Sequence, residues 1–174
     1  TRSNRKITFT ALIATIAMAA SAGTYAASNP DKTAAFGQSR INASQAVAAA
    51  VAKVGGNATE VDFKHKNGQS YYEVEVVASG QKHEVKVDAA SGKVINSKVE
   101  NDKDSDAVKP AARVSLQQAI ATAESKTGGR VKEADLKNKN GQTYYELETL
   151  NGNQKQEVKV DAASGQVLSA QAAK

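Results

Sequence analysis

The spacing of apolar residues changes along the chain, and each change marks the border of a predicted element. From residue 46 to residue 54 the apolar side chains recur at helical spacing: Ala46, Val47, Ala50, Val51 and Val54. After Gly55-Gly56 the spacing becomes two, through residues 61–66 and the segment QSYYEVEVV. These two segments flank Asn67-Gly68, the preferred two-residue hairpin turn. The pattern predicts a helix followed by antiparallel strands.

The hairpin turn also predicts the strand register. Counting outward from it, and from a second turn at Ser79-Gly80, gives two cross-strand rows of apolar side chains: Val61/Val74/Val85 and Phe63/Tyr72/Val87. Both rows point to the same side of the strands and form a face for the helix to cover. A last short strand is expected to start at residues 93–95, after the turn AASG.

The whole pattern recurs 73 residues later. The nine letters EVKVDAASG stand at residues 84–92 and again at 157–165, and residues 41–97 align with 114–170 without a gap, with 30 of 57 positions identical. Both copies begin with a capping-box sequence, Asn42 with Gln45 and Ser115 with Gln118. The predicted fold class is therefore α+β, with two tandem copies of a helix packed on a three- to four-stranded antiparallel sheet.

The residues outside the copies have different compositions. Residues 1–26 combine an early basic segment, an uncharged apolar run and small residues, which is typical of a secretory signal peptide. We expect cleavage after Ala26, with Ala22 as the other candidate. Residues 27–40 are small and polar and are expected to form a flexible leader, and residues 98–113 are expected to form a charged linker.

Composition narrows the class of protein. The chain is 24% charged and 40% hydrophobic, as soluble globular proteins are, and it has no cysteine and therefore no disulfide framework. Removal of the signal peptide would lower the net charge from +5 to +2, and the remaining lysines alternate with acidic residues. This distribution disfavours nucleic-acid binding. The predicted location is periplasmic or secreted, without a stable membrane anchor after cleavage.

A family resemblance rests on the strand and turn sequences. The order of a helix with AxxxA spacing, a Gly turn, Tyr-Glu-Val/Leu-Glu and the closing VDAASGxV resembles the PepSY domain, here in tandem. PepSY domains occur in propeptides of thermolysin-like metallopeptidases and in exported bacterial proteins. The resemblance implies a module that restrains peptidases, and any inhibition by this chain is expected to act in trans.

Residues suited to catalysis or metal binding do not repeat. His65 and His83 are the only histidines, and their counterparts in the second copy are Asn138 and Gln156. The second copy is expected to fold in the same way without them, so both histidines are interpreted as ordinary, partly exposed residues. We predict no enzyme activity, no cofactor and no metal site.

The residues that repeat and point away from the helix are the candidates for binding a protein partner. The predicted register places three glutamates of each copy in one cross-strand row beside an exposed tyrosine: Glu60, Glu75, Glu84 and Tyr71, and Glu133, Glu148, Glu157 and Tyr144. Tyrosine is frequent at interfaces, and like charges side by side cost stability. The simpler interpretation is a solvated face on which lysines such as Lys64 and Lys86 offset the charge.

Two functions follow from these predictions. The first is an exported, non-catalytic binding module that restrains or inhibits a secreted or periplasmic peptidase, or another envelope protein, in trans. The alternative is a structural or cation- and cell-wall-binding protein of the envelope.

Overall fold

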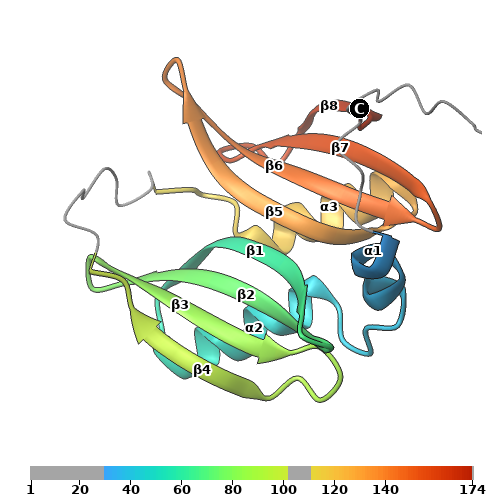
Figure 1. Ribbon diagram of the computed structural model, residues 1–174. Helices are drawn as coiled ribbons and strands as arrows, with labels where there is room; N and C mark the ends of the chain where they lie inside the picture. Colours follow the sequence, from blue (N-terminus) through green and yellow to red (C-terminus); the bar gives the residue numbers. More distant parts are fainter. Residues whose placement is uncertain (1–29, 102–110, 174) are drawn as a thin grey trace, which may run out of the picture.

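A computed structural model describes residues 30–101 and 111–173 of the chain (Figure 1). Its elements are, in chain order, α1 (Pro30–Gly37), α2 (Ala43–Val54), β1 (Asn57–Lys66), β2 (Gln69–Ala78), β3 (Gln81–Asp88), β4 (Val94–Val99), α3 (Leu116–Thr127), β5 (Arg130–Lys139), β6 (Gln142–Asn151), β7 (Gln154–Asp161) and β8 (Val167–Ala172). The predicted signal peptide and most of the predicted linker lie outside the described residues.

The register predicted from the hairpin turns is confirmed. Phe63 pairs with Tyr72 and Val61 with Val74, while Val74 and Tyr72 pair on their other side with Val85 and Val87. All six side chains are completely buried. Asn67 and Gly68 both have a positive φ, 51° and 75°, as a tight two-residue hairpin requires.

The two copies share one sheet, which corrects the expectation of two separate sheets. All eight strands form a single antiparallel sheet in the order β4-β3-β2-β1-β5-β6-β7-β8 (Figure 1). The two halves join where β1 pairs with β5, and at the centre of this contact Val61 pairs with Ala134. An isolated copy would leave the backbone groups of β1 or β5 unpaired at a sheet edge, and joining the edges satisfies them.

The join has two-fold pseudosymmetry. Ala134 is the residue 73 positions after Val61, so equivalent positions of the two copies face each other. Glu60 pairs with Asp135, and Asp62 pairs with Glu133, which repeats the same relation on either side of the central pair. The two halves of the molecule therefore contact each other through equivalent residues, as the subunits of a symmetric dimer do.

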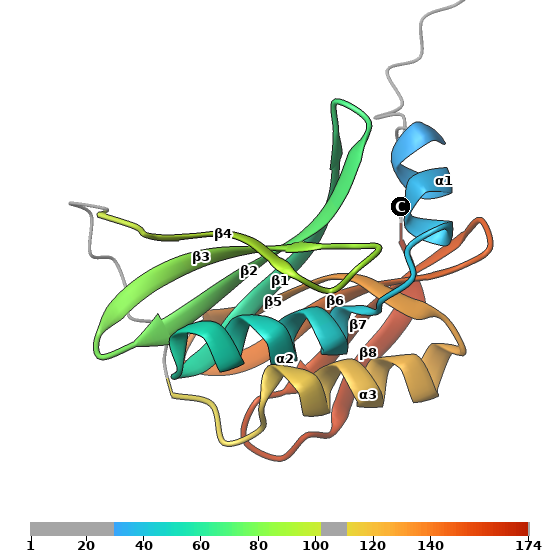
Figure 2. The same cartoon turned by 90° about the horizontal axis from the view of Figure 1, so that it is seen from below.

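The helices α2 and α3 lie side by side on one face of the sheet (Figure 2). Both begin with the predicted capping box, in which the Asn42 or Ser115 side chain accepts the N–H of the residue three positions on. After α2 the chain passes close to β2 at Gly56, where a Cβ atom would lie 2.1 Å from the Val77 carbonyl oxygen. Only glycine fits at this point, so its occurrence here is structural.

The helix α1 corrects the prediction of a flexible leader. Within residues 27–40, residues 30–37 are helical, and the Phe36 side chain is only 2% exposed. The Phe36 ring packs edge-on against Phe63 with 5.2 Å between ring centroids, and the Arg130 guanidinium lies 5.0 Å from the centre of the Phe36 ring. One aromatic side chain thus anchors the polar segment to the shared core.

The repeated VDAASG sequence forms the same turn in both copies. One oxygen of Asp88 accepts the backbone N–H groups of Ala90 and Ser91 and the Ser91 hydroxyl, at 3.1, 2.7 and 2.8 Å. Asp161 makes the equivalent three hydrogen bonds in the second copy. The N–H of Ser91 is the main cause of a lowered pKa for Asp88, and that of Ser164 for Asp161.

These two aspartates predict a loss of stability in acid. Because the folded-state pKa of each lies below its ordinary value of 3.8, their stabilisation is complete above that pH and disappears as the pH falls through the lower folded-state pKa. We expect the Asp88→Asn, Asp161→Asn variant to melt at a lower temperature than the parent at pH 6. The difference should shrink as the pH is lowered below 3.8. Melting temperatures measured across this range check it, and a constant difference would contradict it.

Candidate functional site

The predicted rows of glutamates are present on the sheet face opposite α2 and α3. Glu75 pairs across the strands with Glu60 on one side and Glu84 on the other, and Glu148 pairs in the same way with Glu133 and Glu157. Each row borders a shallow hollow of about 100 to 120 Å³ lined mainly by carboxylates. The sequence therefore predicted correctly which glutamates come together.

Lysine side chains occupy the spaces between these carboxylates. In the first copy Lys82 lies 2.7 Å from Glu75, and Lys98 lies 3.3 Å from Glu84. In the second copy the carboxylate of Glu148 lies 2.7 Å from the ammonium group of Lys132 and 3.0 Å from that of Lys155. The face is a network of alternating charges rather than a simple acidic patch.

Two glutamates of the second row have opposite pKa shifts. Burial would raise the pKa of Glu148, but the hydrogen bonds from Lys132 and Lys155 outweigh it and lower the pKa. The pKa of Glu133 is raised, first by loss of hydration and then by the carboxylates of Asp62 and Glu148. The glutamate with the raised pKa thus lies at the join between the two copies.

The tyrosines are less exposed than predicted. Tyr71 points to the outer face, as the register requires, but only 8% of it is exposed, and Tyr144 is half-buried. The ammonium group of Lys86 lies 5.3 Å from the centre of the Tyr71 ring, and Lys159 lies 5.6 Å from that of Tyr144. The prediction of Tyr71 as an exposed anchor is wrong, because long neighbouring side chains cover an aromatic ring in the middle of a sheet.

The histidines are not members of these rows. His65 Nδ1 is 2.8 Å from the Ser70 hydroxyl, and His83 pairs across the strands with Val76. Within residues 30–101 and 111–173, no group of three or more His, Cys, Asp or Glu side chains is placed to hold a metal ion. In the same residues, every helix is too short or too polar to span a membrane.

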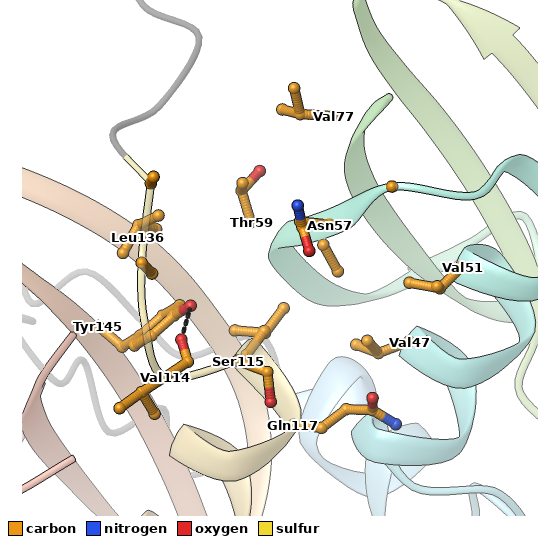
Figure 3. A pocket seen from close by; sticks show the side chains of 15 residues that line it. Val47, Val51, Asn57, Thr59, Val77, Val114, Ser115, Gln117, Leu136 and Tyr145 are labelled. Carbon is orange, nitrogen blue, oxygen red and sulfur yellow. Dashed lines mark hydrogen bonds between the residues drawn. The ribbon is translucent and has the colours of Figure 1, made fainter. Parts of the chain in front are cut away.

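A second candidate site is an apolar pocket of about 360 Å³ where the two copies meet (Figure 3). Leu136 and Tyr145 from the sheet of the second copy form one wall, and Val47 and Val51 from α2 form the opposite wall. The Tyr145 hydroxyl donates a hydrogen bond of 2.7 Å to the Val114 carbonyl, so its polar atom is satisfied and the ring presents an apolar surface.

The rim of this pocket is polar and comes from both copies. Asn57, the first residue of β1, lines it together with Thr59, Ser115 and Gln117. The Gln117 amide donates a hydrogen bond of 3.3 Å to the Ser44 carbonyl and ties the start of α3 to α2. Sequence reasoning missed the pocket because it treated the copies separately. The signal available was the replacement of Phe63 by the smaller Leu136 at the equivalent position.

The fold and these sites define a duplicated helix-on-sheet domain with a polar sheet face and an apolar pocket at the junction. The family model described as "Peptidase propeptide and YPEB domain", PepSY, matches twice, over residues 40–98 and 113–171. The chain belongs to this family. The resemblance predicted from the Tyr-Glu and VDAASG sequences is confirmed.

Solved structures give more distant similarities. A predicted lipoprotein from Clostridium difficile 630 is 24% identical, with a TM-score of 0.44 over 67% of this chain and 82% of that chain. The YpeB C-terminal domain of Bacillus megaterium is 13% identical, with a TM-score of 0.32 over 78% and 67%. A BLIP-like protein from Bacteroides fragilis NCTC 9343 is 19% identical, with a TM-score of 0.27 over 79% and 91%. No curated protein matches the chain.

Proposed function

We propose that the chain is an exported, non-catalytic binding module that docks on a peptidase or another envelope protein and restrains it in trans. Membership of a family described by peptidase propeptides supports the choice of partner. The observation that carries the proposal is the continuous outer sheet face, on which both copies present the same row of three glutamates paired with lysines.

The charge network suits recognition of a protein surface. Lys86 lies within 3.7 Å of both Glu73 and Glu84, and Lys159 lies within 3.4 Å of both Glu146 and Glu157. Side chains held in this way lose little further freedom on binding, which reduces the entropic cost of forming an interface. A cation- or cell-wall-binding role would instead need carboxylates that are not already neutralised by lysines, so we favour the protein partner.

The sheet face predicts a charge-sensitive inhibition. We expect the protein without residues 1–26 to reduce peptide hydrolysis by the peptidases in an envelope extract, and the Glu84→Gln, Glu157→Gln variant to inhibit more weakly. The first substitution removes a carboxylate that Lys86 and Lys98 contact, and the second removes one that Lys159 contacts. We expect about a tenfold or larger loss of inhibitory potency if these residues lie centrally in the interface. Hydrolysis of a fluorogenic peptide, followed against inhibitor concentration, measures it.

A matched control separates the face from net charge. The Ala52→Lys, Ser125→Lys variant makes the same change in net charge at two equivalent, exposed helix positions on the other side of the molecule. It should inhibit like the parent. Equal potency of all three proteins would reject the sheet face as the binding surface, and absence of inhibition by the parent would reject restraint of a peptidase.

A further inference from the structure

The pseudosymmetry gives the apolar pocket a counterpart, and that counterpart is filled. The Phe36 ring contacts Phe63 and the Arg130 guanidinium. The Tyr72 ring packs on the Phe63 ring, with 5.4 Å between ring centroids. The residues 73 positions after Phe63 and Tyr72 are Leu136 and Tyr145, and both line the pocket. The pocket therefore occupies, in the second copy, the place that Phe36 fills in the first.

The rim residues obey the same relation. Arg130 is the first residue of β5, and its equivalent in the first copy is Asn57, which lines the pocket. Ile41, whose carbonyl accepts hydrogen bonds from Tyr72 and Arg130, corresponds to Val114, whose carbonyl accepts the Tyr145 hydroxyl. The two sites are thus built from equivalent backbone and side-chain positions, one around an aromatic ring and one around a cavity.

The sequence does not repeat the aromatic residue. The position 73 residues after Phe36 is Lys109, outside the described residues, and the chain has only three phenylalanines. The pocket has also changed in shape, since Leu136 is smaller than Phe63 and Asn57 is shorter than Arg130. The described part of the second copy therefore offers a site for a ring without an equivalent of Phe36 to fill it.

One ion pair of the two copies matches as well. Next to the filled site, the carboxylate of Asp62 forms ion pairs with Lys32, at 3.4 Å, and with Lys64. Lys32 lies one helical turn before Phe36 in α1. In the second copy, the equivalent Asp135 contacts Lys137, the equivalent of Lys64. The ion pair of this aspartate with the lysine two residues on is therefore common to both copies.

We propose that the pocket receives an aromatic side chain from a segment of the partner protein, in the manner of Phe36. This rests on the proposed function and gives the partner a chemical description. Exchange of α1 between two copies of this chain is less suited, because Phe36 is only 2% exposed in its own site and would have to leave it. The pocket and the outer sheet face then contact different parts of one partner.

A peptide with the sequence of residues 30–37, PDKTAAFG, is the probe for this proposal. Titrated into the protein without residues 1–26 and followed by two-dimensional NMR, it should shift the amide signals of Asn57, Leu136 and Tyr145. The same peptide with Phe36→Ala should bind at least about tenfold more weakly, as expected for loss of a buried aromatic anchor. The signals of Glu84 and Glu157 on the outer face should stay in place.

A gain-of-binding variant makes the test independent of damage to the fold. Asn57 is exposed, and Asn57→Arg restores the cation that stacks on Phe36 in the filled site, so it should tighten peptide binding about two- to fivefold. The pocket-filling variant Ala112→Trp should abolish the shifts while keeping the parent's melting temperature within a few degrees.

Three results would overturn the proposal. Shifts confined to the outer face would move the binding site there and leave the proposed function intact. Shifts at Phe63 and Arg130 would show exchange with α1 rather than occupation of the pocket. Absence of any shift with both the parent and Asn57→Arg would show that the pocket does not take an aromatic segment, whatever the inhibition assay finds.

Discussion

Replacement of Tyr72 by alanine is expected to lower the free energy of unfolding by about 3 to 5 kcal/mol, the range for large buried aromatic residues. The Tyr72 side chain is completely buried, packs on Phe63, and its hydroxyl donates to the Ile41 carbonyl at 3.2 Å. Burial raises its pKa, so the hydroxyl stays protonated and keeps this donor throughout the ordinary pH range. Chemical denaturation followed by circular dichroism measures the loss.

Tyr145 provides the matched comparison in the second copy. Its hydroxyl donates the equivalent hydrogen bond, to the Val114 carbonyl, and burial raises its pKa to about 12. It differs from Tyr72 in that Leu136 takes the place of Phe63 and the ring borders the pocket. Tyr145→Ala should therefore cost less than Tyr72→Ala, since part of its surroundings is already empty. A larger cost for Tyr145→Ala would contradict the description of the pocket as a cavity beside this ring.

The second large effect is expected for Phe36→Ala, at about 3 kcal/mol of unfolding free energy. This side chain is the buried anchor of α1, through its contacts with Phe63 and Arg130. Its removal should free α1 and raise the hydrogen-exchange rates of residues 32–37, because a helix of eight residues is not stable without packing. Denaturation and hydrogen exchange measured on the same variant check both parts.

Lys32→Ala is the control for this experiment. It removes the partly exposed ion pair with Asp62 on the same helix, which should cost about 0.5 kcal/mol or less. If Phe36→Ala is no more harmful than Lys32→Ala, then α1 does not contribute to the core, and the sequence-based prediction of a flexible leader would be right after all.

The sequence was sufficient for every feature that depends on local periodicity. Asn67-Gly68 allows one tight turn, and alternation then determines which side chains share a face, so the pairing of Tyr72 with Phe63 and of Glu75 with Glu84 followed by counting. The capping boxes at Asn42 and Ser115 were predictable for the same reason, because cap and partner are three residues apart.

The features that failed depend on contacts between distant segments. The pairing of β1 with β5 uses backbone groups, which every residue has, so no residue type in the sequence indicates it. Phe36 is a single aromatic residue in a polar segment, and nothing local distinguishes an anchor from an exposed side chain. Tyr71 follows the outward alternation, yet Lys86 on the adjacent strand covers it.

The pairing of Val61 with Ala134 has an evolutionary consequence. A single ancestral copy could have joined its β1 edge to that of an identical molecule, and any mutation would then have appeared at both sides of the two-fold axis at once. Fusion of the two copies into one gene removes that constraint, because each side now has its own codons. Phe63 and Leu136, or Arg130 and Asn57, can diverge independently, so one side could become a permanent structural contact while the other stayed open to selection for a ligand.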